Sequence, residues 1–194
     1  NRPEFRKRYL SNPKNPNVFE ANAIVFEGPE DYHLRINDEN LNINENSILM
    51  IRGCGPVGYP GSAEVVNMQP PDKLLKKGIN TLPTLGDGRQ SGTSESPSIL
   101  NVSPESAIGG GLLIVETGDK IKIDLNNSRI DLLISNEEIE KRKKDVKIPK
   151  LENQTPWQEI ARKMVGQLET GACLETESLY LDITNTKGIP RHSH

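Results

Sequence analysis

Short apolar runs separated by glycine- and proline-rich stretches dominate the first two thirds of the chain. Four runs, AIVFE, SILMIR, TLPTL and LLIVE, predict strands at residues 23–27, 47–52, 81–85 and 112–116. Alternating apolar and polar residues predict a half-exposed strand at 120–125, and a further strand is expected at 130–134. Because few long helices separate these strands, we expect a curled or barrel-like sheet rather than a doubly wound fold.

Helix signals are weaker and increase toward the end of the chain. Residues 71–78 (PDKLLKKG) have a proline at a plausible first helical position and a terminal glycine, which is typical of a short capped helix. Ser103 and Pro104 predict the start of another short helix, and residues 136–144 predict a charged one. Thr155 followed by proline predicts a helix that runs to about Leu168.

These patterns divide the chain into three parts. Residues 1–22 are rich in Asn, Pro and charge and are interpreted as a linker or extended arm from a preceding domain, and we expect the chain to be a fragment. Residues 23–148 carry the strands, and residues 149–194 form a helical carboxy-terminal extension. The prediction is therefore an α/β fold with a mixed, curled sheet, short flanking helices and a helical tail.

Composition excludes several classes of protein. The formal net charge is −3 and the basic residues are scattered, which argues against nucleic-acid binding. No apolar run approaches the roughly 20 residues that cross a bilayer, so we expect no membrane association. Cys54 and Cys173 are too few for a disulfide scaffold or a metal cluster, and they are interpreted as reduced thiols. A cluster used by this protein would have to be held mainly by residues outside this chain.

The first candidate for chemistry follows the segment GCGPVGYPG at residues 53–61. Four glycines and two prolines in these nine residues predict a shaped loop instead of a helix or strand. Glu64 lies just after this loop and is a candidate oxygen ligand for a divalent cation. The alternative is an acidic residue in the first turn of a helix, and the residue types alone favour that alternative.

The second candidate is the segment GDGRQSGTS at residues 86–94. Glycines on both sides of Ser91 allow backbone N–H groups to face an anion, and they allow the Ser91 and Thr93 hydroxyls to point toward the same ligand. Arg89 is a candidate substrate contact in the same loop. The alternative is a polar loop whose hydroxyls cap backbone groups, and the residue types alone favour it. The final residues, 191–194 (RHSH), allow either a tail without fixed structure or one that reaches a site.

Several long motifs recur together and in order between residues 23 and 142. They are FEGPEDYHLRIN (26–37), ILMIRGCGPVGYPGSAEVVNMQPP (48–71), LPTLGDGRQSGTSESPSILNVSPESAIGGG (82–111), TGDKIKIDL (117–125) and ISNEEIEKR (134–142). Together they resemble the carboxy-terminal domain of the dihydroxy-acid/phosphogluconate dehydratase family. The resemblance implies a swivelling β/β/α-type domain.

Details of these motifs indicate a branch of the family. SGTS in place of a glycine-glycine form, and PGSAEVVNMQPP in place of a PGMPEM-type loop, resemble aldonate dehydratases acting on L-arabinonate or D-xylonate. The segments TPWQEI and GIPRHSH resemble the same branch. Glu95 departs from the pattern, because glycine is common at its position in the family.

The resemblance implies a hydro-lyase whose amino-terminal domain is not in this chain. That domain would supply cysteine ligands to a [2Fe-2S] cluster and most ligands of Mg²⁺. By position, Ser91 matches the proposed catalytic base, Thr93 an accompanying hydroxyl, Glu64 a magnesium-contacting carboxylate and Arg89 a substrate or scaffold contact. The expected product is a 2-keto-3-deoxy acid, and the expected protein is a cytoplasmic homo-oligomer.

Two alternatives stay open from the sequence. The first is the dihydroxy-acid dehydratase of branched-chain amino-acid biosynthesis, which belongs to the same family. The second is a non-catalytic barrel that binds small anions or a protein partner.

Overall fold

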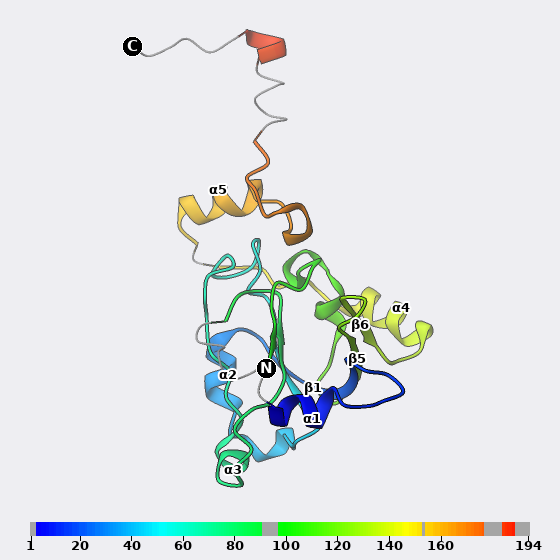
Figure 1. Ribbon diagram of the computed structural model, residues 1–194. Helices are drawn as coiled ribbons and strands as arrows, with labels where there is room; N and C mark the ends of the chain where they lie inside the picture. The colour runs from blue at the N-terminus through cyan, green and yellow to red at the C-terminus, as the bar shows by residue number, and fades with distance from the viewer. Residues whose placement is uncertain (1–2, 91–96, 153, 177–183, 189–194) are drawn as a thin grey trace.

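The computed structural model describes residues 3–90, 97–152, 154–176 and 184–188 and is built around one mixed sheet (Figure 1). Its strand order is β4-β3-β2-β1-β5-β6. The strands are β1 (Val18–Phe26), β2 (Ser47–Ile51), β3 (Thr84–Gly86), β4 (Ser98–Ile99), β5 (Lys120–Asp124) and β6 (Arg129–Leu132). β1 to β4 pair in parallel, whereas β5 and β6 are antiparallel to their neighbours. The sheet curls into a half barrel, which confirms the predicted fold class.

The helices around this sheet are short. The α-helices are α1 (Pro3–Tyr9), α2 (Pro29–Arg35), α3 (Asp72–Leu75), α4 (Asn136–Asp145) and α5 (Pro156–Met164). The 3-10 helices are η1 (Glu39–Leu41), η2 (Ser106–Ile108), η3 (Gly111–Ile114) and η4 (Leu168–Thr170). In the part of the chain that the structure describes, no helix has both the length and the apolar character needed to cross a membrane.

The central strands bury both faces, which explains their continuous apolar sequences. In β2 all five residues are buried, with Ile48 and Met50 facing one apolar cluster and Leu49 and Ile51 facing the other. A strand in the middle of a sheet alternates its side chains between the two faces, so both faces need a cover. Strand β5, between β1 and β6, shows the predicted half-exposed pattern, with Ile121 and Ile123 buried between more exposed lysines and Asp124.

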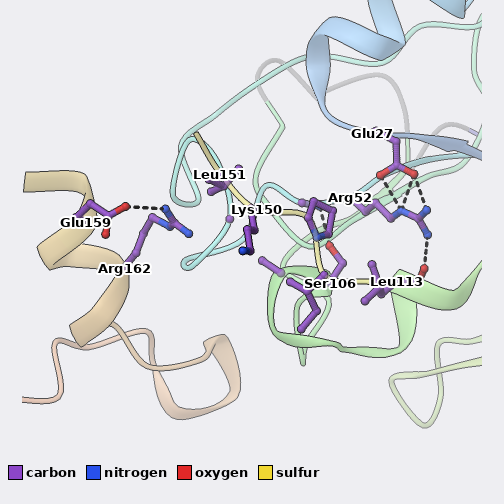
Figure 2. Close-up of a pocket in the computed structure, with 13 residues that line it drawn as sticks. Glu27, Arg52, Ser106, Leu113, Lys150, Leu151, Glu159 and Arg162 are labelled. Atoms are coloured by element: carbon purple, nitrogen blue, oxygen red, sulfur yellow. Dashed lines mark hydrogen bonds and ion pairs between the residues drawn. The ribbon is translucent and has the colours of Figure 1, made fainter. Parts of the chain in front are cut away.

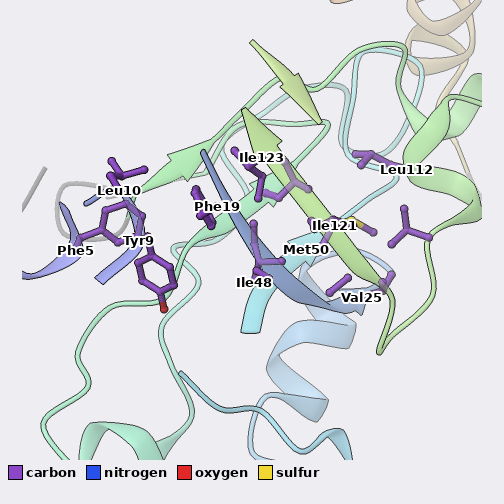
Figure 3. Close-up of a cluster of buried hydrophobic side chains, with 14 residues drawn as sticks. Phe5, Tyr9, Leu10, Phe19, Val25, Ile48, Met50, Leu112, Ile121 and Ile123 are labelled. Carbon is purple, nitrogen blue, oxygen red and sulfur yellow. The ribbon is translucent and has the colours of Figure 1, made fainter. Parts of the chain in front are cut away.

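The amino-terminal residues form part of this core, and Pro3–Tyr9 is the helix α1, where the sequence led us to expect extended chain. Phe5, Tyr9 and Leu10 are buried and pack with Phe19 of β1 against the sheet (Figure 3). The Phe5 and Tyr9 ring centroids lie 4.6 Å apart, and those of Tyr9 and Phe19 lie 5.4 Å apart. Phe5 and Tyr9 are only one helical turn apart, and so short an apolar pattern could not be recognised among the surrounding Asn and Pro residues.

Two further predictions differ from the structure. The predicted strand at residues 112–116 is the 3-10 helix η3, because its carbonyl groups bond to Arg52 instead of to a neighbouring strand. Helix α2 was missed, although Pro29 at its start and two acidic residues in its first turn are helix signals. By contrast, the predicted cap of α5 is confirmed, since Thr155 and Gln158 form a capping box, and the helix ends at Met164.

Candidate active site

The glycine-rich loop, residues 53–61, follows directly from β2 and folds back on itself. Tyr59 N donates to Gly53 O at 2.8 Å, and Ser62 N donates to Cys54 O and Gly55 O at 3.0 and 3.1 Å. A Cβ atom at Gly58 would lie 2.2 Å from Gly53 O, so only glycine fits at this crossing. The prediction of a shaped loop is confirmed.

A buried carboxylate, Asp87, holds the beginning of this loop. It accepts hydrogen bonds from Gly53 N at 3.0 Å and Cys54 N at 2.9 Å, and it is fully buried. It also accepts from the backbone N and the hydroxyl of Ser106, at 2.9 and 2.6 Å. Asp87 was missed as a functional residue from the sequence. The available signal was an acidic residue between two glycines directly after a buried strand, where loop N–H groups need an acceptor.

A second buried carboxylate, Glu105, holds the middle of the loop. Its oxygens accept from Val57 N at 2.8 Å and from Gly58 N at 2.9 Å. Its exposed fraction is 0%, which is rare for glutamate unless the carboxylate is hydrogen-bonded. Glu105 was also missed as a functional residue, because the sequence places it 47 and 48 positions away from its loop partners.

The candidate residues Glu64 and Arg89 lie side by side at the exit of the loop. Their backbones form an isolated parallel β-bridge, in which Val65 N donates to Arg89 O at 3.3 Å. The Arg89 side chain donates from Nε to Ser62 O at 2.6 Å. Both Glu64 and Arg89 are exposed. The structure therefore brings together the two loops that the sequence singled out.

Ser91 and Thr93 lie outside the described residues. Their proposed roles stay predictions. The structure does describe the residues that lead into their segment, and these end beside Glu64 at the bridge with Arg89.

The two cysteines lie in different environments: Cys54 is buried and Cys173 is exposed. Burial raises the pKa of the Cys54 thiol to about 12, and the negative charges of Asp87, Glu30 and Glu105 add to this effect. Among the residues with described coordinates, no three His, Cys, Asp or Glu side chains are grouped to hold an ion. The described residues therefore do not fit a [2Fe-2S] cluster, whereas the exposed Glu64 carboxylate fits one oxygen ligand of Mg²⁺.

Two cavities flank the glycine-rich loop where the carboxy-terminal extension crosses it. One, of about 470 Å³, lies between the Arg52–Glu27 pair and Arg162 of α5 (Figure 2). The Arg52 guanidinium donates to the carbonyl oxygens of Leu112, Leu113 and Val115, so Arg52 stabilises the fold beside this cavity. The other cavity, of about 280 Å³, lies between α5 and a set of loop residues: Pro56, Gly58, Tyr59, Pro60, Gly61 and Ser62.

Comparison with known proteins identifies the family of this architecture. The family model for the dihydroxy-acid/6-phosphogluconate dehydratase C-terminal domain matches residues 8–172. The chain belongs to this family. The match includes both buried carboxylates, the glycine-rich loop and α5.

Relatives within the dehydratase family include sugar-acid dehydratases and a dihydroxy-acid dehydratase. D-xylonate dehydratase of Caulobacter vibrioides is 62% identical over 192 residues, which are 98% of this chain and 32% of that protein. L-arabinonate dehydratase of Rhizobium leguminosarum is 49% identical over 125 residues, covering 64% of this chain and 22% of that protein. Dihydroxy-acid dehydratase of Pyrococcus furiosus is 37% identical over 158 residues, covering 81% and 28%. The chain thus spans at most about a third of the length of these relatives.

Proposed function

We propose that the full-length protein carrying this chain is a sugar-acid dehydratase that converts an aldonate, such as D-xylonate or L-arabinonate, to a 2-keto-3-deoxy acid. The observation that carries this proposal is the 62% identity to a D-xylonate dehydratase across 98% of the chain. The bridge between Glu64 and Arg89 supports it, because it brings the two candidate loops to one place.

The chemistry assigns a role to each candidate residue. Ser91 takes the proton from C2 of the substrate, which is acidified by the neighbouring carboxylate. The C3–O bond then breaks, the proton taken by Ser91 passes to the departing hydroxyl so that water leaves, and the resulting enol tautomerises to the 2-keto acid. Thr93 and Arg89 orient the substrate oxygens. Glu64 would hold Mg²⁺, which when bound stabilises negative charge on the substrate carboxylate and hydroxyl.

The remaining components of the reaction belong to polypeptide outside this chain. The chain covers 32% of the D-xylonate dehydratase, so an additional amino-terminal region accounts for most of that relative. We propose that this region is the partner domain, that it supplies the cysteine ligands of a [2Fe-2S] cluster, and that the protein works as a cytoplasmic homo-oligomer.

The proposal is tested with Ser91→Ala in the full-length protein. We expect kcat/KM for the aldonate to fall about 10³-fold, because a positioned base contributes factors of this order. Ser94→Ala is the matched control, since it removes a hydroxyl from the same segment and has no assigned role. Activity of Ser91→Ala close to that of Ser94→Ala would remove Ser91 from the reaction.

Substrate choice is tested in the same assay. Comparing kcat/KM for D-xylonate, L-arabinonate and 2,3-dihydroxyisovalerate separates the aldonate function from the branched-chain one. We expect an aldonate to be preferred. Preference for 2,3-dihydroxyisovalerate would assign the chain to the dihydroxy-acid branch, and turnover of none of the three would contradict the proposed function.

A further inference from the structure

Hydrogen bonds through Glu105 connect the carboxy-terminal extension to the glycine-rich loop. Gln167, between α5 and η4, donates from Nε2 to Glu105 Oε1 at 2.7 Å. In return, Glu105 N donates to Gln167 Oε1 at 3.1 Å. Oε1 of Glu105 also accepts a hydrogen bond from Val57 N of the loop. One carboxylate oxygen therefore joins the extension to the loop directly.

A second hydrogen bond from the extension holds the carbonyl group of Val57. Arg162 of α5 donates from Nε to Val57 O at 2.7 Å. The backbone N–H of Val57 thus donates to Glu105, which is hydrogen-bonded to the extension. The Val57 carbonyl accepts from Arg162 of the extension itself. Both polar groups of this residue are fixed, and each bond involves a charged side chain, which strengthens it.

The packing around Glu105 leaves the loop little freedom to adjust. A Cβ atom at Gly55 would lie 2.4 Å from Glu105 Oε2, so the loop backbone is in close contact with the carboxylate. None of the ion pairs among the described residues involves Glu105. N–H donors stabilise its buried carboxylate, and loss of one donor removes part of this stabilisation.

Further hydrogen bonds connect the loop to the candidate site. Ser62 N donates to Cys54 O and Gly55 O, so the loop fixes Ser62. Ser62 O in turn accepts from Arg89 Nε, and the bridge between Arg89 and Glu64 follows two residues later. A continuous set of short contacts therefore leads from Gln167 to Glu64.

We propose that Glu105 and Gln167 are positioning residues, through which the carboxy-terminal extension sets the placement of Glu64 and Arg89. Gln167 lies in the extension and Glu64 beyond the loop, so the pair gives the extension a role in the placement of the site. The catalytic part of this proposal rests on the proposed function, whereas the structural part does not.

The test compares Gln167→Ala with Gln154→Ala in the full-length protein. Gln154 is the matched control, because it lies in the same extension and also lines the cavity beside the loop, whereas its side-chain hydrogen bond in the described part of the chain is local, to Glu152 O. The first measurement is amide hydrogen exchange of the peptide covering residues 55–62. We expect exchange to be about tenfold faster in Gln167→Ala and unchanged in Gln154→Ala, since a hydrogen bond to a charged group is lost.

The second measurement is steady-state kinetics with the aldonate. We expect Gln167→Ala to raise KM about tenfold and to change kcat by less than about threefold, because substrate placement is affected while the candidate base is retained. Glu105→Gln keeps the shape of the side chain but directs an amide N–H at one loop donor, so we expect the same pattern with a larger KM.

The outcomes separate the two proposals. Equal exchange in the Gln167→Ala and Gln154→Ala variants would overturn the positioning role, whether or not the wild type shows activity. Faster exchange with kinetics identical to Gln154→Ala would overturn the link to the site. Absence of aldonate turnover in the wild type would contradict the proposed function alone, and the exchange experiment would still decide whether Glu105 and Gln167 hold the loop.

Discussion

β2 and the glycine-rich loop are consecutive in the chain, yet they are held in different ways. β2 buries every side chain between two apolar clusters, so its position depends on packing. In the loop, only Cys54 belongs to an apolar cluster, and the fixed groups are backbone N–H donors bonded to Asp87 and Glu105. Apolar packing is shared among many neighbours, whereas the N–H groups of Cys54, Val57 and Gly58 each donate to one carboxylate. The loop should therefore respond to changes at one or two side chains.

The largest expected effect lies on the sheet side of this comparison. Phe26 is fully buried in β1, and its ring contacts Tyr32 at a centroid distance of 5.4 Å. We expect Phe26→Ala to lower the free energy of unfolding by about 4 kcal/mol, because it removes a large side chain and leaves a cavity. Chemical denaturation checks this value. Leu34→Ala is the control, since its side chain is 83% exposed, and a similar loss there would contradict the argument.

A somewhat smaller effect is expected on the loop side. Asp87→Ala leaves the N–H groups of Gly53, Cys54 and Ser106 without their carboxylate acceptor, and we expect a loss of about 3 kcal/mol in unfolding free energy. Asp87→Asn retains one acceptor oxygen and should lose roughly half as much. Denaturation of both variants provides the measurement. If the alanine and asparagine variants were equally stable, the loop would not depend on these hydrogen bonds.

The smallest expected effect concerns the thiol where the two regions meet. Burial raises the pKa of Cys54 from its ordinary value of 9.0 to about 12, so the folded protein favours the protonated thiol. This contribution is complete below pH 9, and the first pH unit above that value removes about 1 kcal/mol of it. Burial also raises the pKa of Tyr9 and Tyr32, which adds a loss above pH 10.

Comparing wild type with Cys54→Ala isolates the contribution of the thiol. We expect the stability of Cys54→Ala to fall less steeply between pH 9 and 10, as measured by denaturant titration. In the native wild type, Cys173, which is exposed, should react with a thiol reagent at neutral pH while Cys54 does not. Rapid modification of both thiols would show that Cys54 is not held as described.

The same difference explains what could be predicted from the sequence. Strands such as β2 were predicted because burial on both faces leaves a continuous apolar run, Ser47–Ile51. The Thr155 cap was predicted because its signal is local, within three residues. Gly53 to Gly61 were recognised as a loop for the same reason.

What the sequence did not reveal depends on distant contacts. Glu105 bonds to Val57 and to Gln167, and no local pattern links these three positions. Helix η3 has the composition of a strand, but Arg52 takes the carbonyl groups that a neighbouring strand would have bonded. The family resemblance pointed to Glu64 and Arg89, whereas only the structure shows that they form a bridge.

The strand order also affects how the protein folds during synthesis. β1 pairs with β2 after a connection that contains α2 and η1, but its other edge pairs with β5, so that Val18 lies opposite Asp124. Contacts between such distant positions form slowly, and until then an unpaired strand edge is available to other chains. More than a hundred residues must leave the ribosome before β1 gains its second neighbour. Nascent chains that stall before β5 are therefore the form of this protein most in need of a chaperone.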